Sequence, residues 1–302
     1  MIRLSGASVR CGIVLAGDDG RRLQPFINLF RKEGPPKQYV NFVGARSMLE
    51  HTLDRAEKLL PRHLIFTVVG RHHLTHPDVQ RQLGNRAGGI FIIQPENKDT
   101  LPGILLPLMH VYLRYPDSSV VVFPSDHFIA EGDEDLFSLY VARAFQAVER
   151  EPSQLILLGV EPDRIEPEYG YILTAGRERR LESLGICRVN RFIEKPETSV
   201  ARELIKQGAL WNTMVTVFKT KTLLSLVRVL EPKLFKSFAD ISQAIGTFRL
   251  KETVDYAYES MEPSSFSATI LQARDPSLPW HLSVLPMRDV LWSDWGSAFR
   301  IA

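Results

Sequence analysis

Short apolar runs rich in β-branched residues alternate with longer amphipathic stretches through the first half of the chain. The runs occupy residues 11–16, 64–70, 90–94, 119–124 and 155–160, and several are apolar at nearly every position. Continuous apolar runs of this length are typical of strands that are covered on both faces of a sheet. We therefore predict that these runs form the strands of a largely parallel sheet.

The longer stretches between the runs have the apolar spacing of helices. In residues 47–60, Ser47 and Glu50 have the spacing of a capping box, the apolar side chains fall on one face, and a proline follows the last turn. Residues 102–114 and 135–149 have similar patterns. Strands and helices that alternate on this scale predict an α/β domain whose central sheet is flanked by helices.

The second half of the chain is less regular. Residues 168–173 and 186–196 look like strands near a hairpin, residues 199–208 like a helix, and residues 214–218 and 281–286 like further strands. We expect the rest of the last third to be mostly helical. No internal repeat, low-complexity tract or linker marks a firm boundary, so we predict a single domain with an insertion-like second lobe.

The composition excludes several classes of protein. The 302 residues include 37 Lys+Arg and 35 Asp+Glu, which is too even a balance for the broad basic surface of a nucleic-acid binder. No apolar run approaches the roughly 20 residues of a membrane helix, and the N-terminus lacks the apolar core of a signal peptide. Cys11 and Cys187 have no histidine at metal-ligand spacing, so we expect reduced, buried thiols. We predict a cytoplasmic protein that binds neither nucleic acid nor membrane.

A loop with two glycines follows the first predicted strand. Residues 17–20 read Gly-Asp-Asp-Gly, and Arg21 and Arg22 come next. Such a loop can turn successive backbone N–H groups toward an anion, and the arginines can neutralise phosphate. The loop matches neither the P-loop nor the GxGxxG fingerprint. By itself it also fits an ordinary strand-to-helix turn with solvated charges.

The later segments make the chain resemble the sugar nucleotidyltransferases. LAGDDGRRL followed by PPKQY is similar to the family's LAG-G-x-G-T-R-L … PKQ signature. QPENKDTLPGI (94–104) and PSDHFI (124–129) resemble the E-P-x-G-R-N-T-A-P-A and A-D-H-x-I segments of the mannose-1-phosphate guanylyltransferase branch. Similar blocks follow in the family's order: PEYGYI (167–172), FIEKPE (192–197), LWNTMVTVF (210–218), TVDYAYE (253–259) and WSDWGSAF (292–299). The resemblance spans residues 12–299.

The resemblance implies a Rossmann-like nucleotide-diphospho-sugar transferase fold with a mixed, mostly parallel sheet. One nucleotidyltransferase domain would cover residues 1–302, with a nucleotide-binding half at about 1–160 and a sugar-binding lobe at about 161–302. The chain stops just after the last block, so we expect no C-terminal β-helix or cupin domain. A homodimer is left open.

The implied reaction joins a sugar 1-phosphate to a nucleoside triphosphate (NTP) and releases pyrophosphate. GTP and mannose 1-phosphate are the favoured pair. The sugar phosphate oxygen attacks the α-phosphorus in line, so catalysis depends on positioning and on neutralising charge.

Two aspartates are the implied ligands of Mg²⁺. Asp126 directly follows the apolar run 119–124, where a carboxyl-end loop of an open α/β sheet presents residues to ligand. Asp294 is the matching aspartate of the WSDWGS segment, and the pair offers the oxygen ligands that Mg²⁺ prefers. Taken alone, Asp126 also fits a helix N-cap or a turn. We expect His127 beside it to be structural.

Matching positions supply the other expected site residues. Arg22 can contact phosphate oxygens in a bidentate manner, whereas Lys37 is a compact charge. The expected catalytic residues are Arg22, Lys37, Asp126, Lys195 and Asp294. The expected nucleotide-binding residues are Leu15, Ala16, Gly17, Gly20, Arg22, Lys37, Asn97, Asp99 and Thr100. The expected sugar-phosphate-binding residues are Gly170, Glu194, Lys195 and Asn212. As an unaided pair, Glu194 and Lys195 also read as an exposed ion pair at a strand end.

Some residues depart from the family pattern. Asp18 replaces the second glycine of LAGG, and a carboxylate about 4 Å from a phosphate charge costs about 4 kcal/mol at an effective dielectric constant near 20. Asp18 therefore turns outward, faces a metal, or weakens triphosphate binding. Asp99 replaces the asparagine of R-N-T, and Met214 replaces a glycine near the expected sugar site. Asp19 falls at a variable position and is assigned no role.

These departures keep other functions open. The alternative function is a weakened or non-catalytic homologue that binds a nucleotide or nucleotide sugar and acts as a regulatory subunit. A glycosyltransferase of related fold is a further alternative, and it would require a D-x-D metal motif. His127 and Phe128 follow Asp126, so that motif is absent there.

Overall fold

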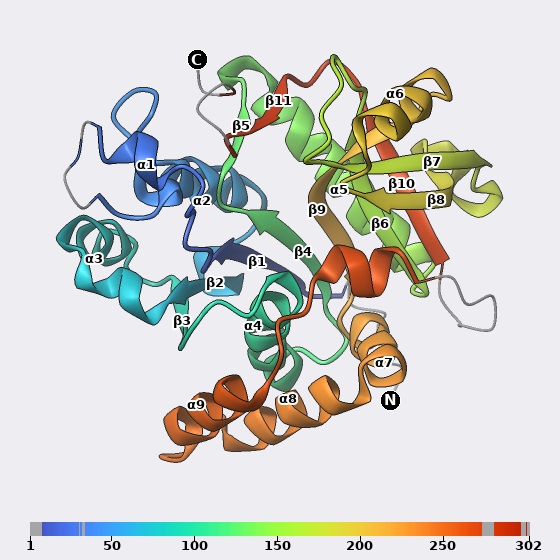
Figure 1. Ribbon diagram of the computed structural model, residues 1–302. Coiled ribbons are helices and arrows are strands. Elements are labelled where there is room, and N and C mark those ends of the chain that lie inside the picture. The colour runs from blue at the N-terminus through green and yellow to red at the C-terminus, as the bar shows by residue number, and fades with distance from the viewer. Residues whose placement is uncertain (1–7, 30, 32–33, 274–280, 297–299, 301–302) are drawn as a thin grey trace, which may run out of the picture.

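A nine-stranded mixed sheet runs through the protein, and helices cover both of its faces (Figure 1). The computed structural model describes residues 8–29, 31, 34–273, 281–296 and 300. The strand order is β3 (Ile90–Gln94), β2 (Ile65–Gly70), β1 (Arg10–Ala16), β4 (Ser119–Pro124), β9 (Leu210–Lys219), β6 (Gln154–Val160), β10 (His281–Met287), β8 (Cys187–Glu194) and β7 (Gly170–Arg177).

The strands from the first part of the chain are parallel. β3, β2, β1 and β4 pair in parallel registers, and β6 and β10 form another parallel pair. β9 is antiparallel to both β4 and β6, so it joins the two groups, and β7 and β8 form an antiparallel hairpin at the edge. The predicted mixed, mostly parallel sheet is confirmed.

Two apolar cores lie on the two faces of the sheet. Successive side chains of a strand point to opposite faces, so β1 sends Val14 and Ala16 into one core and Cys11 and Ile13 into the other. The helices are α1 (Gln24–Ile27), α2 (Met48–Leu59), α3 (Pro77–Gly84), α4 (Thr100–Arg114), α5 (Glu134–Arg150), α6 (Thr198–Lys206), α7 (Thr220–Leu230), α8 (Pro232–Ala244) and α9 (Leu250–Ser260). The first core lies beneath α2 and α5, and the second beneath α4, α7, α8 and α9.

The predicted elements agree with most of the observed ones. The strand expected at 214–218 begins earlier, at Leu210, and the helix expected at 102–114 begins at Thr100. Sequence analysis missed β5 (His127–Ile129) and β11 (Trp292–Asp294), which pair with each other in a separate two-stranded sheet. Strands of three residues are too short to show an alternating pattern.

Two further expectations concern cysteines and membranes. Cys11 and Cys187 are both free, but only Cys11 is fully buried and Cys187 is partly exposed. No helix in the described part of the chain is long and apolar enough to cross a membrane.

The capping box predicted at the start of α2 is present. The Ser47 hydroxyl accepts a hydrogen bond from the Glu50 N–H at 3.2 Å, and the Glu50 carboxylate accepts one from the Ser47 N–H at 2.8 Å. Ser47 also donates to the Gln82 side chain at 2.7 Å, so one hydroxyl links α2 to α3.

We expect Ser47→Ala to lower the free energy of unfolding by about 1–2 kcal/mol, because the N-cap acceptor is lost. Chemical denaturation measures the change. Ser199→Ala, at an exposed position of α6, is the control and should change stability by less than about 0.5 kcal/mol. Equal effects of the two substitutions would contradict the role of the cap.

Candidate active site

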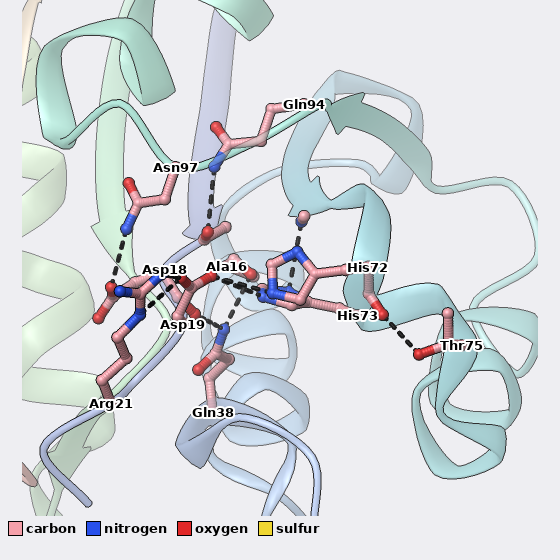
Figure 2. Close-up of polar contacts among 12 residues, drawn as sticks. Ala16, Asp18, Asp19, Arg21, Gln38, His72, His73, Thr75, Gln94 and Asn97 are labelled. Carbon is pink, nitrogen blue, oxygen red and sulfur yellow. Dashed lines mark hydrogen bonds and ion pairs between the residues drawn. The ribbon is translucent and has the colours of Figure 1, made fainter. Parts of the chain in front are cut away.

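Side-chain amides hold the backbone of the loop Gly17–Gly20, which follows β1. Gln38 donates to the carbonyl oxygen of Ala16 at 2.9 Å and to that of Asp18 at 2.7 Å. Gln94, at the end of β3, donates to the carbonyl oxygen of Gly17 at 3.0 Å (Figure 2). The loop therefore has a defined path at the carboxyl end of the sheet.

The glycines of the loop are required by close contacts. A Cβ atom on Gly17 would lie 2.4 Å from Nε2 of Gln94. Gly20 has a φ of 62°, and a Cβ atom there would lie 2.9 Å from Cγ of Lys37. Both positions exclude other residues without a shift of the backbone or of the neighbouring side chain.

Two adjoining cavities open beside this loop. The first has a volume of about 480 Å³ and the second about 510 Å³, and both are lined by Asp18, Lys37, Asn97 and Asp294. The predicted nucleotide residues that line only the first are Leu15, Gly17, Asp99 and Thr100. Predicted residues that line only the second are Gly20, Arg22 and Lys195. Ala16 is buried behind the loop and lines neither.

Lys37 and Asp126 form an ion pair at the wall of the first cavity. The Lys37 Nζ lies 2.6 Å from Oδ2 of Asp126, and Lys37 is only 9% exposed. Burial acts to lower the pKa of Lys37, but the carboxylates of Asp126, Asp18 and Asp294 together raise it. Burial acts to raise the pKa of Asp126, but the charges of Lys37 and His127 and the hydrogen bond from Lys37 together outweigh burial, and the pKa falls to about 2.

The small sheet of β5 and β11 brings Asp126 and Asp294 to the same place. Asp294 pairs with His127 across the two strands, and the Trp295 N–H donates to the carbonyl oxygen of Asp126 at 3.1 Å. His127 packs edge-on against Trp292, with ring centroids 5.2 Å apart, and burial lowers its pKa to about 4. Its packing agrees with the structural role expected for it, although it also lines the first cavity.

Asp294 has partners that the sequence did not identify. Its Oδ1 accepts hydrogen bonds from the Tyr169 hydroxyl and from the Arg300 guanidinium. Arg300 also bonds to Glu166, through Nη2 at 3.0 Å. Tyr169 lies in the PEYGYI segment, but nothing in that segment distinguishes it from Tyr171.

Asp18 faces the cavities. The Asn97 amide donates to Oδ1 of Asp18 at 3.1 Å (Figure 2). Asp18 is exposed to solvent within the open cavities. Its pKa is raised, first because the surrounding protein removes part of its hydration and then because Asp126 is close, while Lys37 opposes the shift. The outward orientation considered for Asp18 is therefore wrong.

The predicted sugar-phosphate residues gather on neighbouring strands. Gly170 of β7 pairs with Glu194 of β8, and a Cβ atom on Gly170 would lie 3.4 Å from Cβ of Asn212 in β9. Burial raises the pKa of Glu194, while the charge of Lys195 and a hydrogen bond with Ser267 oppose the shift. Gly170, Glu194 and Asn212 line neither of the two cavities. Lys195 Nζ lies 3.9 Å from Glu194, and Arg22 contacts Glu168 across the second cavity.

Three site residues adopt the left-handed backbone conformation that favours glycine. Asp99, Lys195 and Met214 have φ values of 70°, 44° and 58°. Such residues are costly in ordinary structure and gather at functional sites. Met214 adopts this conformation at the position where the resemblance implies glycine, and its side chain lines the first cavity.

The family model for nucleotidyl transferases matches residues 11–298. The chain belongs to the nucleotidyl transferase family. Among its relatives, this nucleotidyl transferase is 27% identical over 294 residues to the mannose-1-phosphate guanylyltransferase RfbM of Salmonella typhimurium, a match that covers 94% of this chain and 56% of RfbM. It is 29% identical over 221 residues to the xanthan biosynthesis protein XanB of Xanthomonas campestris, covering 73% of this chain and 44% of XanB. The chain spans about half the length of these curated relatives.

A solved structure also resembles this nucleotidyl transferase. The protein from Thermus thermophilus that is described as a mannose-1-phosphate geranyltransferase superposes with a TM-score of 0.78 at 25% identity, covering 95% of this chain and 76% of that one. The predicted family, the predicted similarity to mannose-1-phosphate guanylyltransferases and the predicted fold are confirmed.

We expect Gln38→Leu to lower the free energy of unfolding by about 1–3 kcal/mol. The substitution removes the side-chain hydrogen bond to the Asp18 carbonyl and one of two to the Ala16 carbonyl, which keeps the bond from the Tyr39 hydroxyl. Denaturant unfolding measures the change. Gln207→Leu, at the exposed end of α6, is the matched control and should be nearly neutral. A neutral Gln38→Leu would show that the loop does not depend on this amide.

Proposed function

We propose that this protein transfers a nucleotidyl group from an NTP to a sugar 1-phosphate, forming a nucleotide sugar and pyrophosphate. The observation that carries the proposal is the convergence of Lys37, Asp126 and Asp294 beside the loop Gly17–Gly20. These groups come from three distant segments, and all belong to one wall at the carboxyl end of β1 and β4. Open α/β sheets bind ligands at this edge.

The two adjoining cavities offer a separate place for each of the two reactants. We assign the nucleotide to the first cavity and the sugar phosphate to the second, which Lys195 lines. Glu194 precedes Lys195 in the chain, and both Glu194 and Asn212 lie beside Gly170. We retain the proposed nucleotide-binding half of about 1–160 and sugar-binding lobe of about 161–302, and both contribute residues to each cavity. The names of relatives such as RfbM favour GTP and mannose 1-phosphate as the pair.

Guanine also suits the acceptors of the first cavity. Gln94 Oε1 is buried and has no hydrogen-bond partner among the described residues, and Asp99 lines the same cavity. Guanine presents N1–H and N2–H₂ donors, which carboxylate and amide oxygens can accept.

The donor set fits a Mg²⁺ ion. Asp126 and Asp294 offer carboxylate oxygens on one cavity wall, and hard oxygen donors are those that Mg²⁺ takes. When bound, the ion would neutralise and orient phosphate oxygens. We assign its ligands to Asp126 and Asp294.

The cationic side chains orient the two anionic reactants. Lys37 is fixed by its carboxylate partners, so its charge is in place before substrate arrives. Arg22 and Lys195, which are half-exposed or more, lie on the wall of the second cavity and can approach phosphates from its side. The sugar phosphate oxygen then attacks the α-phosphorus in line, with no covalent enzyme intermediate.

One observation favours a second function. Asp18 adds a carboxylate to both cavities, where it opposes the binding of phosphate. A homologue that binds a nucleotide sugar without turnover, as a regulatory subunit, could tolerate that charge. Activity measurements separate the two functions.

We expect release of pyrophosphate with Mg²⁺ when NTPs and sugar 1-phosphates are tested in all combinations, with the fastest turnover for GTP and mannose 1-phosphate. Asp126→Asn and Asp294→Asn should each lower kcat by at least about 100-fold, because each removes a carboxylate ligand of the ion that would neutralise the phosphate oxygens. Asp163→Asn, on the exposed surface, should leave kcat unchanged.

One result would contradict the proposed reaction, and another would contradict the proposed metal site. Binding of a nucleotide without turnover in any combination favours the regulatory homologue. Full activity of either the Asp126 or the Asp294 variant excludes that residue from the proposed metal site.

We expect Asp18→Asn to bind NTP at least about tenfold more tightly than wild type in the presence of a chelator, because a repulsive charge is removed. Isothermal titration calorimetry at pH 8 measures the affinity, and Asp163→Asn is the control. Equal affinities of wild type and Asp18→Asn would show that Asp18 does not oppose the triphosphate.

A further inference from the structure

Two histidines and an aspartate lie close together on the side of the loop Gly17–Gly20 that faces β2 (Figure 2). Asp19 belongs to the loop after β1, and His72 and His73 belong to the 3₁₀ turn Arg71–Thr75 after β2. β1 and β2 are parallel neighbours, with Ala16 paired with Val69. The segments that leave their carboxyl ends therefore start side by side.

The spacing of the three groups is that of metal ligands. Oδ1 of Asp19 lies 3.0 Å from Nε2 of His72 and 3.6 Å from Nε2 of His73. The ligand atoms of all three lie within 4.8 Å of one another. In a tetrahedral zinc site with bonds of about 2.0–2.1 Å, neighbouring ligand atoms are about 3.3 Å apart. The two measured distances bracket this value.

Two buried polar atoms at the centre of the cluster have no hydrogen-bond partner among the described residues. They are Oδ1 of Asp19 and Nε2 of His73, and the His73 side chain is 0% exposed. The other carboxylate oxygen of Asp19 is already used, because it accepts from Nε and Nη2 of Arg21 at 3.2 and 3.0 Å. The separation of 3.6 Å between Asp19 and His73 is too long for a hydrogen bond. The contact of Oδ1 with His72 at 3.0 Å is an ion pair only when His72 is protonated. A buried polar atom without a partner, such as Nε2 of His73, is costly, and a bound cation would remove this cost.

The opposite edge of the His73 ring has a support suited to a metal ligand. Nδ1 of His73 lies 3.3 Å from the Tyr39 hydroxyl, which itself donates to the Ala16 carbonyl at 3.2 Å. Metal-bound imidazoles donate their second ring N–H to an outer acceptor, and Tyr39 supplies one. In the absence of an ion, the Gly70 N–H donates a hydrogen bond to Nδ1 at 3.3 Å, so Nδ1 is the acceptor and Nε2 carries the proton. Metal binding would thus move the ring proton from Nε2 to Nδ1.

We propose that Asp19, His72 and His73 bind a divalent transition-metal ion, with Zn²⁺ the best match. Two imidazoles and one carboxylate are the donor types of open zinc sites, in which water or a ligand takes the fourth position. Hard Mg²⁺ prefers oxygen donors and is suited instead to Asp126 and Asp294. The His72 side chain is 53% exposed, so an ion has access from solvent. The ion would link the loop Gly17–Gly20 to the turn Arg71–Thr75 after β2.

The test uses the untagged full chain after treatment with a chelator. We expect calorimetry to detect one Zn²⁺ per chain in excess Mg²⁺, and Co²⁺ to give the visible absorption of a tetrahedral site. His72→Ala and Asp19→Asn should each weaken Zn²⁺ binding by at least about tenfold. His63→Ala, an exposed histidine of another turn, and Asp126→Asn should bind Zn²⁺ as wild type does.

A second measurement does not depend on calorimetry. Zn²⁺ should raise the Tm of wild type and of His63→Ala, but not of His72→Ala, because an ion that binds only the folded state stabilises it. His72 is largely exposed, so its substitution should leave the fold intact, which circular dichroism verifies.

The proposal is overturned if His72→Ala and Asp19→Asn bind Zn²⁺ like wild type. It is also overturned if Asp126→Asn alone abolishes binding, since the ion then occupies the carboxylate site. Neither measurement involves turnover, so a failure of this site is distinct from a failure of the proposed reaction.

Discussion

One buried ammonium group holds the carboxylates of the candidate site together. Lys37 lies 2.6 Å from Asp126, and the charges of Asp18 and Asp294 also stabilise its protonated form. Buried charges are stable only when they are paired, and the removal of one partner leaves the others uncompensated. The close packing of Gly20 against Lys37 fixes where that charge lies. The loop, the two cavities and their acidic wall therefore depend on the placement of one side chain.

Much of the sheet was predictable from the sequence, because strands buried on both faces must be apolar at successive positions. β1, β2, β3 and β4 have that pattern, and their parallel order places the glycine loop and Asp126 at one edge. The meeting of Asp126 with Asp294 was not predictable from local pattern. It depends on two three-residue strands, and only the family resemblance had placed the aspartates together.

Sequence patterns do not predict side-chain direction or backbone strain. Asp18 could have pointed either way, and only the position of Asn97 and of the cavity walls decides between them. Met214 and Lys195 adopt a left-handed backbone, which neither methionine nor lysine indicates in a sequence. Asp19 falls at a variable position of the motif, and the two histidines that face it lie in the turn after another strand and match no spacing rule, so the sequence assigns it no role.

The wall shared by the two cavities has a thermodynamic consequence. Asp18 and Lys37 line both, so an anion that enters one changes the electrostatic potential in the other. The resulting coupling free energy is reciprocal: each ligand alters the affinity for its neighbour by the same factor, whichever arrives first. The electrostatics of the wall therefore link the two occupancies without imposing an order of addition.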